Sequence, residues 1–313
     1  MKKDTGIRII LNGYFRSGTT FLWRYLNNSL KNDFICFYEP LHPELAKLVS
    51  LSLKGERFNF LHKDFLWEEY TQLNERILNK LFINHPNITN DGISNEFVLK
   101  LYLDIFDNLN KKVLLQPNRL HFFFDFLSQN YNCKIIHIVR HPLDVFSSMQ
   151  KMYDDNPHRG IKRLIIKILK PYGALYLTNF EIEKNYLWIK RHYGINSNNF
   201  SIRFFNPFDI FGKFVVVWTI SNYYAMKSLE RNKGHLIVYE KLIQDTTSTL
   251  KDLCNYLEIP YNSDLSIKEN NSFKFEKNEI QRLLKKVKSY GIEKEFNYIL
   301  QKINTGYNIK YLK

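Results

Sequence analysis

The sequence predicts an α/β fold in which a parallel sheet is flanked by helices. Three observations predict it. Five short apolar runs have the length and composition of buried strands, helical patterns follow four of them, and a glycine-bearing turn joins the first run to the first helix. Regular alternation of strand and helix is typical of a parallel sheet that is covered on both faces. A chain of 313 residues is long enough to bury such a sheet within one large domain.

The predicted strands are runs rich in branched or aromatic apolar residues, beginning with Ile-Arg-Ile-Ile-Leu at 7–11 and Phe-Ile-Cys-Phe-Tyr at 34–38. The remaining three lie at 113–115, 134–139 and 235–239. Helical patterns predict helices at 19–30, 119–129, 143–152 and 247–257, and Pro142 suits the first turn of the third.

Parallel sheets bind ligands beyond the carboxyl ends of their strands. We therefore expect the loops that begin near Asn12, Glu39, Gln116, Arg140 and Glu240 to converge. The segments at about 42–110 and 154–233 have a helical character and no clear linker, which predicts insertions within one domain of residues 1–313. They are expected to cap the sheet and to shape the cleft for an acceptor.

The chain is basic, with a formal net charge of +14. This charge indicates an anionic partner, although a Lys- and Asn-rich proteome would give the same balance. The absence of an arginine-rich tract or a nucleic-acid motif argues against DNA or RNA. The three cysteines show no metal or disulfide spacing, and we see neither a signal peptide nor an apolar run of membrane-spanning length. These features predict a cytoplasmic protein.

Gly13 and Gly18 have the G-x-x-x-x-G spacing of a phosphate-binding P-loop, which directs backbone N–H groups and a helix N-terminus at an anion. A nucleoside triphosphatase would continue with Lys and then Ser or Thr. This chain has Thr19 and Thr20 there, and its cation, Arg16, lies inside the loop. The loop predicts a P-loop-like fold that binds a phosphate-like group without splitting a triphosphate.

A second motif begins where the predicted strand 134–139 ends. Arg140 and Ser148, eight residues apart, can contact one phosphate through a guanidinium fork and a hydroxyl. A salt bridge between Arg140 and Asp144 is the simpler alternative.

Together the motifs resemble the sulfotransferases that use 3′-phosphoadenylyl sulfate (PAPS). Arg16-Ser-Gly-Thr-Thr-Phe21 is similar to their 5′-phosphosulfate loop, and the segment from Arg140 to Ser148 to their 3′-phosphate motif. Trp218, followed by His-Leu-Ile-Val-Tyr-Glu-Lys-Leu at 235–242 and by Asp245, resembles a third family segment. The resemblance covers roughly residues 7–40 and 113–258.

The resemblance implies a donor site for PAPS without a metal. Its residues would be Arg16, Ser17, Gly18, Thr19, Thr20, Phe21, Arg140, Ser148 and Tyr239. Arg16 and the loop amides would also stabilise the charge that develops on the leaving phosphate, which makes Arg16 catalytic. A core position is the alternative for Phe21 and Tyr239, and it is favoured for Trp218.

Glu39-Pro40, at the end of the second predicted strand, is similar to the strand-ending Glu-Pro of Golgi-type carbohydrate sulfotransferases. This resemblance implies that Glu39 is the general base and that the acceptor hydroxyl belongs to a carbohydrate. A partly desolvated carboxylate near cationic loops can take a hydroxyl proton. The alternatives are a structural cap and an ion pair between Glu39 and Arg16.

The sequence departs from the cytosolic branch of the family after 113–115, where no Lys or His occupies the corresponding position. Gln116, Arg119 or Lys274 can supply a second cationic or phosphate-binding group. The basic, amphipathic segment 157–170 suits an acidic glycan or an anionic membrane surface, although a helix packed on the core is the simpler alternative. Two rival functions stay open: a nucleotide or sugar kinase with the same loop, and a non-catalytic glycan-binding protein with a decayed nucleotide site.

Overall fold

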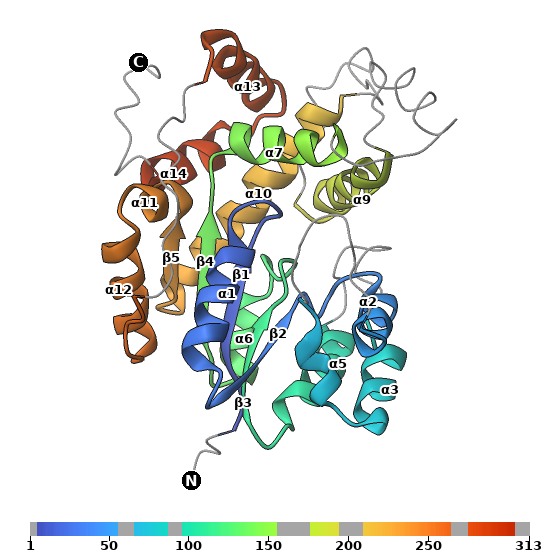
Figure 1. The fold of residues 1–313 in the computed structure, drawn as a ribbon. Helices are drawn as coiled ribbons and strands as arrows, with labels where there is room; N and C mark the ends of the chain where they lie inside the picture. The colour runs from blue at the N-terminus through green and yellow to red at the C-terminus, as the bar shows by residue number, and fades with distance from the viewer. Residues whose placement is uncertain are drawn as a thin grey trace.

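A five-stranded, entirely parallel sheet forms the centre of the molecule (Figure 1). The computed structural model describes residues 5–55, 66–86, 96–154, 176–193, 209–263 and 275–303. The strand order is β2-β3-β1-β4-β5, and the strands are β1 (Gly6–Gly13), β2 (Phe34–Tyr38), β3 (Lys112–Gln116), β4 (Lys134–Val139) and β5 (His235–Val238). The predicted α/β class is confirmed.

Helices join and cover these strands. In Figure 1, α2, α3 and α5 gather beside the β2 edge of the sheet, whereas α11 and α12 lie beside β5 at the other edge. The described helices are α1 (Thr19–Leu30), α2 (Leu45–Leu53), the 3-10 helix η1 (Glu68–Gln72), α3 (Glu75–Ile83), α5 (Glu96–Asp107), α6 (Phe124–Asn130), α7 (Pro142–Asp154), α9 (Tyr176–His192), α10 (Ile210–Arg231), α11 (Tyr239–Gln244), α12 (Thr246–Leu257), α13 (Lys277–Ser289) and α14 (Glu293–Ile303).

The strand order brings three loops together. The chain leaves β1, passes through α1 and returns at the sheet edge in β2. β3 then lies on one side of β1 and β4 on the other. Its register pairs Ile10 with Leu115 of β3 and Gly13 with Ile138 of β4. The loops after these three strands therefore start side by side, at the point where the strand order reverses and where parallel sheets bind ligands.

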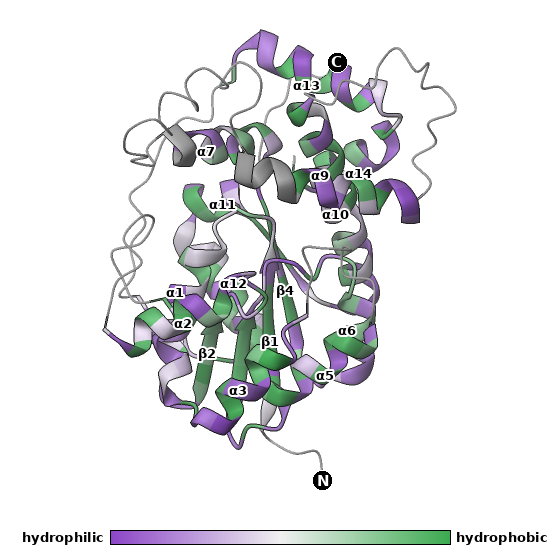
Figure 2. Cartoon of the chain, turned by 90° about the vertical axis from the view of Figure 1, so that its right-hand side faces the viewer, coloured by the Kyte–Doolittle hydropathy of each residue, from purple (hydrophilic) through white to green (hydrophobic). Residues whose placement is uncertain are grey.

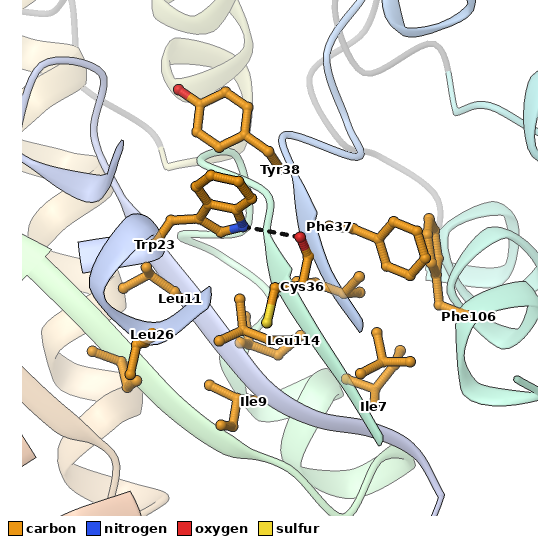
Figure 3. Packing of buried hydrophobic residues seen from close by; sticks show 14 of the residues in the cluster. Ile7, Ile9, Leu11, Trp23, Leu26, Cys36, Phe37, Tyr38, Phe106 and Leu114 are labelled. Atoms are coloured by element: carbon orange, nitrogen blue, oxygen red, sulfur yellow. Dashed lines mark hydrogen bonds between the residues drawn. The ribbon is translucent and has the colours of Figure 1, made fainter. Parts of the chain in front are cut away.

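The core is built on both faces of the sheet, as the apolar strands and the apolar inner faces of the helices in Figure 2 show. Beside β1 and β2, Trp23 of α1 packs on Tyr38 and donates from Nε1 to the carbonyl of Cys36 at 3.1 Å (Figure 3). Phe37 packs on Phe106 of α5. These contacts fix where β2 ends relative to the loop before α1.

Two predicted boundaries are wrong. The helix expected at 119–129 begins only at Phe124, because Asn118 has a left-handed backbone (φ 58°) and the Leu120 N–H donates to Asn12 Oδ1 at 3.1 Å. Tyr239, expected in the fifth strand, starts α11 instead. Val238 is the last residue of β5, and it pairs with Val139, the last residue of β4.

Both predicted insertions contain helices: α2, η1, α3 and α5 fall within 42–110, and α9 and α10 within 154–233. Trp218 of α10 is fully buried, as its core alternative predicts. The basic segment 157–170 and Lys274 lie outside the described residues. No helix in the described part of the chain is long and apolar enough to cross a membrane.

Candidate active site

Left-handed backbone positions cluster at the carboxyl edge of the sheet. Besides Asn118, the non-glycine residues Arg16 (φ 64°) and Glu39 (φ 40°) have positive φ, and they follow β1 and β2. Each such residue costs on the order of 1–3 kcal/mol, and such strain concentrates at active and ligand-binding sites. Strain after three strands therefore makes this edge the candidate functional one.

The loop between β1 and α1 is held by its own hydrogen bonds. The Ser17 hydroxyl donates to the carbonyl of Tyr14, and the Ser17 N–H donates to the same oxygen at 3.1 Å. Ser17 is fully buried, so its hydroxyl and its N–H stabilise the conformation of the loop.

The N-terminus of α1 presents its amides to this edge. Gly18 is the N-cap, no side chain caps the helix, and the first turn contains no acidic residue. The first amides of a helix have no partner within it and carry the positive end of the helix dipole. Thr20 in this turn forms a hydrogen bond of 2.8 Å through Oγ1 with the hydroxyl of Tyr38. An anion is the ligand that such a terminus favours.

Arg16 connects the two predicted phosphate motifs. Its Nε donates to Ser148 Oγ of α7 at 3.0 Å, and its carbonyl accepts from Arg140 Nη1 at 3.0 Å. The structure thus brings together three predicted donor-site residues from segments more than 120 positions apart in sequence. Arg16 lies in the loop before α1 and Arg140 bonds to that loop, so two positive charges meet there.

Tyr239 supports both halves of this cationic site. The Arg140 guanidinium lies over its ring at 4.3 Å from the centroid. A Cβ added to Gly18, whose φ is 101°, would meet the same ring at 2.6 Å. The Tyr239 ring therefore packs directly against Gly18 of the loop and orients the guanidinium of Arg140. Arg140 Nε is buried and has no hydrogen-bond partner among the described residues, as expected for a donor that awaits an anion.

A buried carboxyl group anchors the loop after β4. Glu240 Oε1 accepts from the His141 N–H at 2.7 Å, and the Glu240 side chain is almost fully buried. Burial raises the pKa of Glu240 to about 7. Burial also raises the pKa of Asp144 to about 6, against the opposing effect of Arg140. Both carboxyls lie close to Arg140, which the sequence predicts to contact the 3′-phosphate.

Glu39 lies on the neighbouring strand end, within a network of amides. Asn118 Nδ2 donates to Glu39 Oε1 at 2.9 Å, and Gln116 Nε2 donates to Asn118 Oδ1. The Glu39 N–H donates to the Gln116 carbonyl at 2.9 Å. The Glu39 side chain is 13% exposed, so a substrate can reach the carboxylate although most of it is desolvated.

His42 approaches the same carboxylate, with Nε2 at 3.9 Å from Glu39 Oε2. Burial, and secondarily the nearby Arg119, lowers the pKa of His42 to about 3. The imidazole is therefore neutral at pH 7 and makes no ion pair. The Glu44 N–H donates to His42 Nδ1 at 3.1 Å, which places the imidazole proton on Nε2, toward Glu39.

The remaining predicted residues have varied positions. Thr19 is buried in the first turn of α1, and Phe21 packs half-buried against the main core. The Arg119 guanidinium lies over the ring of Phe15, a residue of the loop before α1, at 4.6 Å from the ring centroid. Gln116 is fully buried in the amide network. Within the described ranges, no group of three or more His, Cys, Asp or Glu side chains can hold a metal ion.

Sequence reasoning missed Asn118 and His42. The Pro-Asn pair at 117–118 is a turn signal, and it could have suggested a left-handed asparagine. Nothing in the sequence pointed to a contact between Asn118 and Glu39, which are 79 positions apart.

A matched pair of glycine variants tests the loop. Gly18→Ala is expected to lower the free energy of unfolding by about 2–3 kcal/mol and to abolish anion binding, because the new Cβ meets Tyr239 at a positive φ. Gly291→Ala also has a positive φ but meets open space, so we expect roughly 1 kcal/mol and normal binding. Denaturant unfolding and nucleotide titration measure both. Equal effects in the two variants would contradict the contact with Tyr239.

The fold and the site define a P-loop-like α/β protein with a cationic loop after β1 and a largely desolvated carboxylate after β2. The sequence model described as "Sulfotransferase domain" matches residues 7–296, nearly the whole chain. The chain therefore belongs to the sulfotransferase family, whose chemistry is sulfuryl transfer.

An uncharacterized protein of Archaeoglobus fulgidus is 32% identical to this chain over 254 residues, which cover 76% of this chain and 80% of that protein. Among solved structures, a sulfotransferase from Alicyclobacillus acidocaldarius is 14% identical, with a TM-score of 0.43, over 95% of both chains. The sulfotransferase domain of the Synechococcus PCC 7002 olefin synthase is 16% identical, with a TM-score of 0.37, over 83% of this chain and 76% of that one.

Proposed function

We propose that this protein transfers the sulfuryl group of PAPS to a hydroxyl group, and that the acceptor is a carbohydrate. The observation that carries the proposal is the pair of hydrogen bonds that joins Arg16 to Ser148 and to Arg140. They bring the predicted 5′-phosphosulfate loop and the predicted 3′-phosphate motif into one cationic site. PAPS carries anionic groups at both ends of its ribose, which suits this arrangement.

The chemistry assigned to each residue follows from charge. The amides of Thr19 and Thr20 and the Arg16 guanidinium would face the 5′-phosphosulfate, and Arg140 and Ser148 the 3′-phosphate. As the bond from sulfur to the bridging oxygen breaks, negative charge grows on the 5′-phosphate. Fixed cationic donors stabilise that charge more in the transition state than in the ground state. Glu39 would accept the proton of the attacking hydroxyl.

The carbohydrate acceptor is supported by the Glu39-Pro40 pattern at the end of β2, the strand next to β3 at the edge of the sheet. Beyond this strand end lies the partly exposed His42 ring, whose centroid is 6.0 Å from that of Trp67. A neutral imidazole N–H and a carboxylate together suit a ligand rich in hydroxyl groups.

A thermal-shift comparison tests the donor. We expect adenosine 3′,5′-bisphosphate to raise the Tm by several degrees, because a ligand at 100 times its Kd adds about 2.7 kcal/mol to the stability. ATP with magnesium should have no comparable effect, and Arg140→Ala should remove the shift. A response to ATP with magnesium alone would instead support a kinase, and no response to either nucleotide would overturn the proposal.

A transfer assay tests the acceptor. Radiolabelled sulfate from PAPS is expected to appear on members of a panel of neutral and acidic glycans, and not on phenols or simple alcohols. Labelling confined to phenols would support sulfuryl transfer from PAPS but would overturn the proposal that the acceptor is a carbohydrate.

A further inference from the structure

We propose that Asn118, held by Gln116, is a positioning residue that orients the carboxylate of Glu39 and keeps it ionised for proton transfer. The inference rests on the proposed function of Glu39 as the general base. It follows from a closed ring of hydrogen bonds between the ends of β2 and β3.

The ring has only one consistent direction. The ionised carboxylate of Glu39 can only accept, so Asn118 directs its Nδ2 at Glu39 Oε1 and its Oδ1 at Gln116 Nε2. Gln116 then turns its Oε1 toward the Glu39 N–H at 3.3 Å, a donor that it shares with the Gln116 carbonyl at 2.9 Å. The acceptor character of the carboxylate thus sets the orientation of both side-chain amides. The carboxylate receives a donor, which stabilises its ionised form.

The ring is rigid because all three residues are constrained. Gln116 is fully buried and Asn118 is 3% exposed. The parallel register pairs Tyr38, the last residue of β2, with Gln116, the last residue of β3, so Glu39 and Pro117 leave the sheet side by side. Glu39 and Asn118 both have left-handed backbones, which turn their side chains back toward each other. Asparagine tolerates this conformation better than most residues.

Other charged or titratable groups also lie near Glu39. They are Arg16 and Arg119, the histidines His42 and His85, and the tyrosines Tyr38 and Tyr70. Burial lowers the pKa of His42 to about 3 and lowers that of His85, so both are neutral near pH 7. Burial raises the pKa values of Tyr38 and Tyr70. Beside Arg140, Asp144 and Glu240 have pKa values raised by burial to about 6 and about 7. The acid limb of Glu39 is therefore the one that moves when Asn118 is changed.

In the proposed step, the sulfuryl group passes from PAPS to the acceptor oxygen. The acceptor oxygen forms a bond to sulfur as the bond from sulfur to the bridging phosphate oxygen breaks. The hydroxyl proton passes to the Glu39 carboxylate, and adenosine 3′,5′-bisphosphate leaves with the electron pair of the broken bond. Asn118 touches neither substrate in this scheme. It acts through the direction and the charge of the carboxylate.

Two variants of Asn118 separate positioning from a structural role. Asn118→Asp keeps the shape and the left-handed conformation but replaces the donor with a second carboxylate. It should lower kcat by about 100-fold with little change in the KM for PAPS, and it should move the acid limb of the pH–kcat profile up by about one pH unit. Asn118→Gly removes the donor without adding charge, and we expect a loss of about 10-fold with a smaller shift. Asn108→Asp, at an exposed site on another loop, should leave kcat and the profile unchanged.

The outcome is read together with nucleotide binding. Both Asn118 variants should keep the wild-type thermal shift with adenosine 3′,5′-bisphosphate, since the donor residues are untouched. A wild-type acid limb in both variants would overturn the positioning role. So would a lower kcat in variants that have also lost the thermal shift with adenosine 3′,5′-bisphosphate. A wild-type protein that neither binds the bisphosphate nor transfers sulfate would overturn the proposed function itself, whatever the Asn118 variants show.

Discussion

Glu39→Gln is expected to lower kcat by about 10²–10⁴-fold while nucleotide binding stays intact. Removal of a general base has an effect of this size. The amide oxygen of the variant can still accept from Asn118 Nδ2, so the geometry of the ring survives and only the basic oxygen is lost. Single-turnover transfer of labelled sulfate measures the rate, and the thermal shift with adenosine 3′,5′-bisphosphate measures binding.

Glu44→Gln provides the matched control. Glu44 is half-exposed five residues further along the chain, where it contacts Lys47 on the surface. It should behave as the wild type. A kcat for Glu39→Gln within threefold of the wild-type value would show that Glu39 is not the general base. It would favour the alternative in which Glu39 is a structural cap.

Arg16→Ala is expected to lower kcat by roughly 10²–10³-fold, the size expected when one donor to a developing charge is removed. It should also weaken binding of the bisphosphate, because the Arg16 Nε no longer orders Ser148. Arg16→Lys keeps the charge but lacks the planar fork, so we expect an intermediate kcat.

Arg76→Ala, an exposed position on α3, serves as the control for a lost positive charge. Ser148→Ala removes the partner of Arg16 without removing charge, and it should weaken the bisphosphate more than it lowers kcat. An Arg16→Ala variant with normal kcat and weak binding would make Arg16 a binding residue only.

Much of the fold could be predicted because its determinants are local. The boundaries of β2 and β4 and of α1 agree with the periodicity of apolar residues and with the glycine before the helix. The helix expected at 119–129 was placed too early because Leu120 is tied to Asn12, a residue more than 100 positions away. Local propensity carries no information about such a partner.

The site divides in the same way. Gly18 and Arg16 were recognisable because a phosphate-binding loop needs a glycine turn before a helix N-terminus. Arg140 was recognisable because it ends a predicted strand eight residues before Ser148. Their assignment to PAPS stays a prediction that the proposed experiments test. The role of Tyr239 as the support of Gly18 and Arg140 could not be read from the sequence, since it depends on where β5 ends beside β4.

By itself, the sequence determined a parallel α/β sheet and a glycine-bearing loop that contains Arg16, for which it predicts anion binding. It also singled out Glu39 as a carboxylate at a strand end. Only the tertiary structure decided that Arg16 bonds to Ser148, and that Gln116 and Asn118 close a ring on Glu39. The physical reason is the register of the parallel strands, which brings together side chains separated by 77 to 132 positions along the chain.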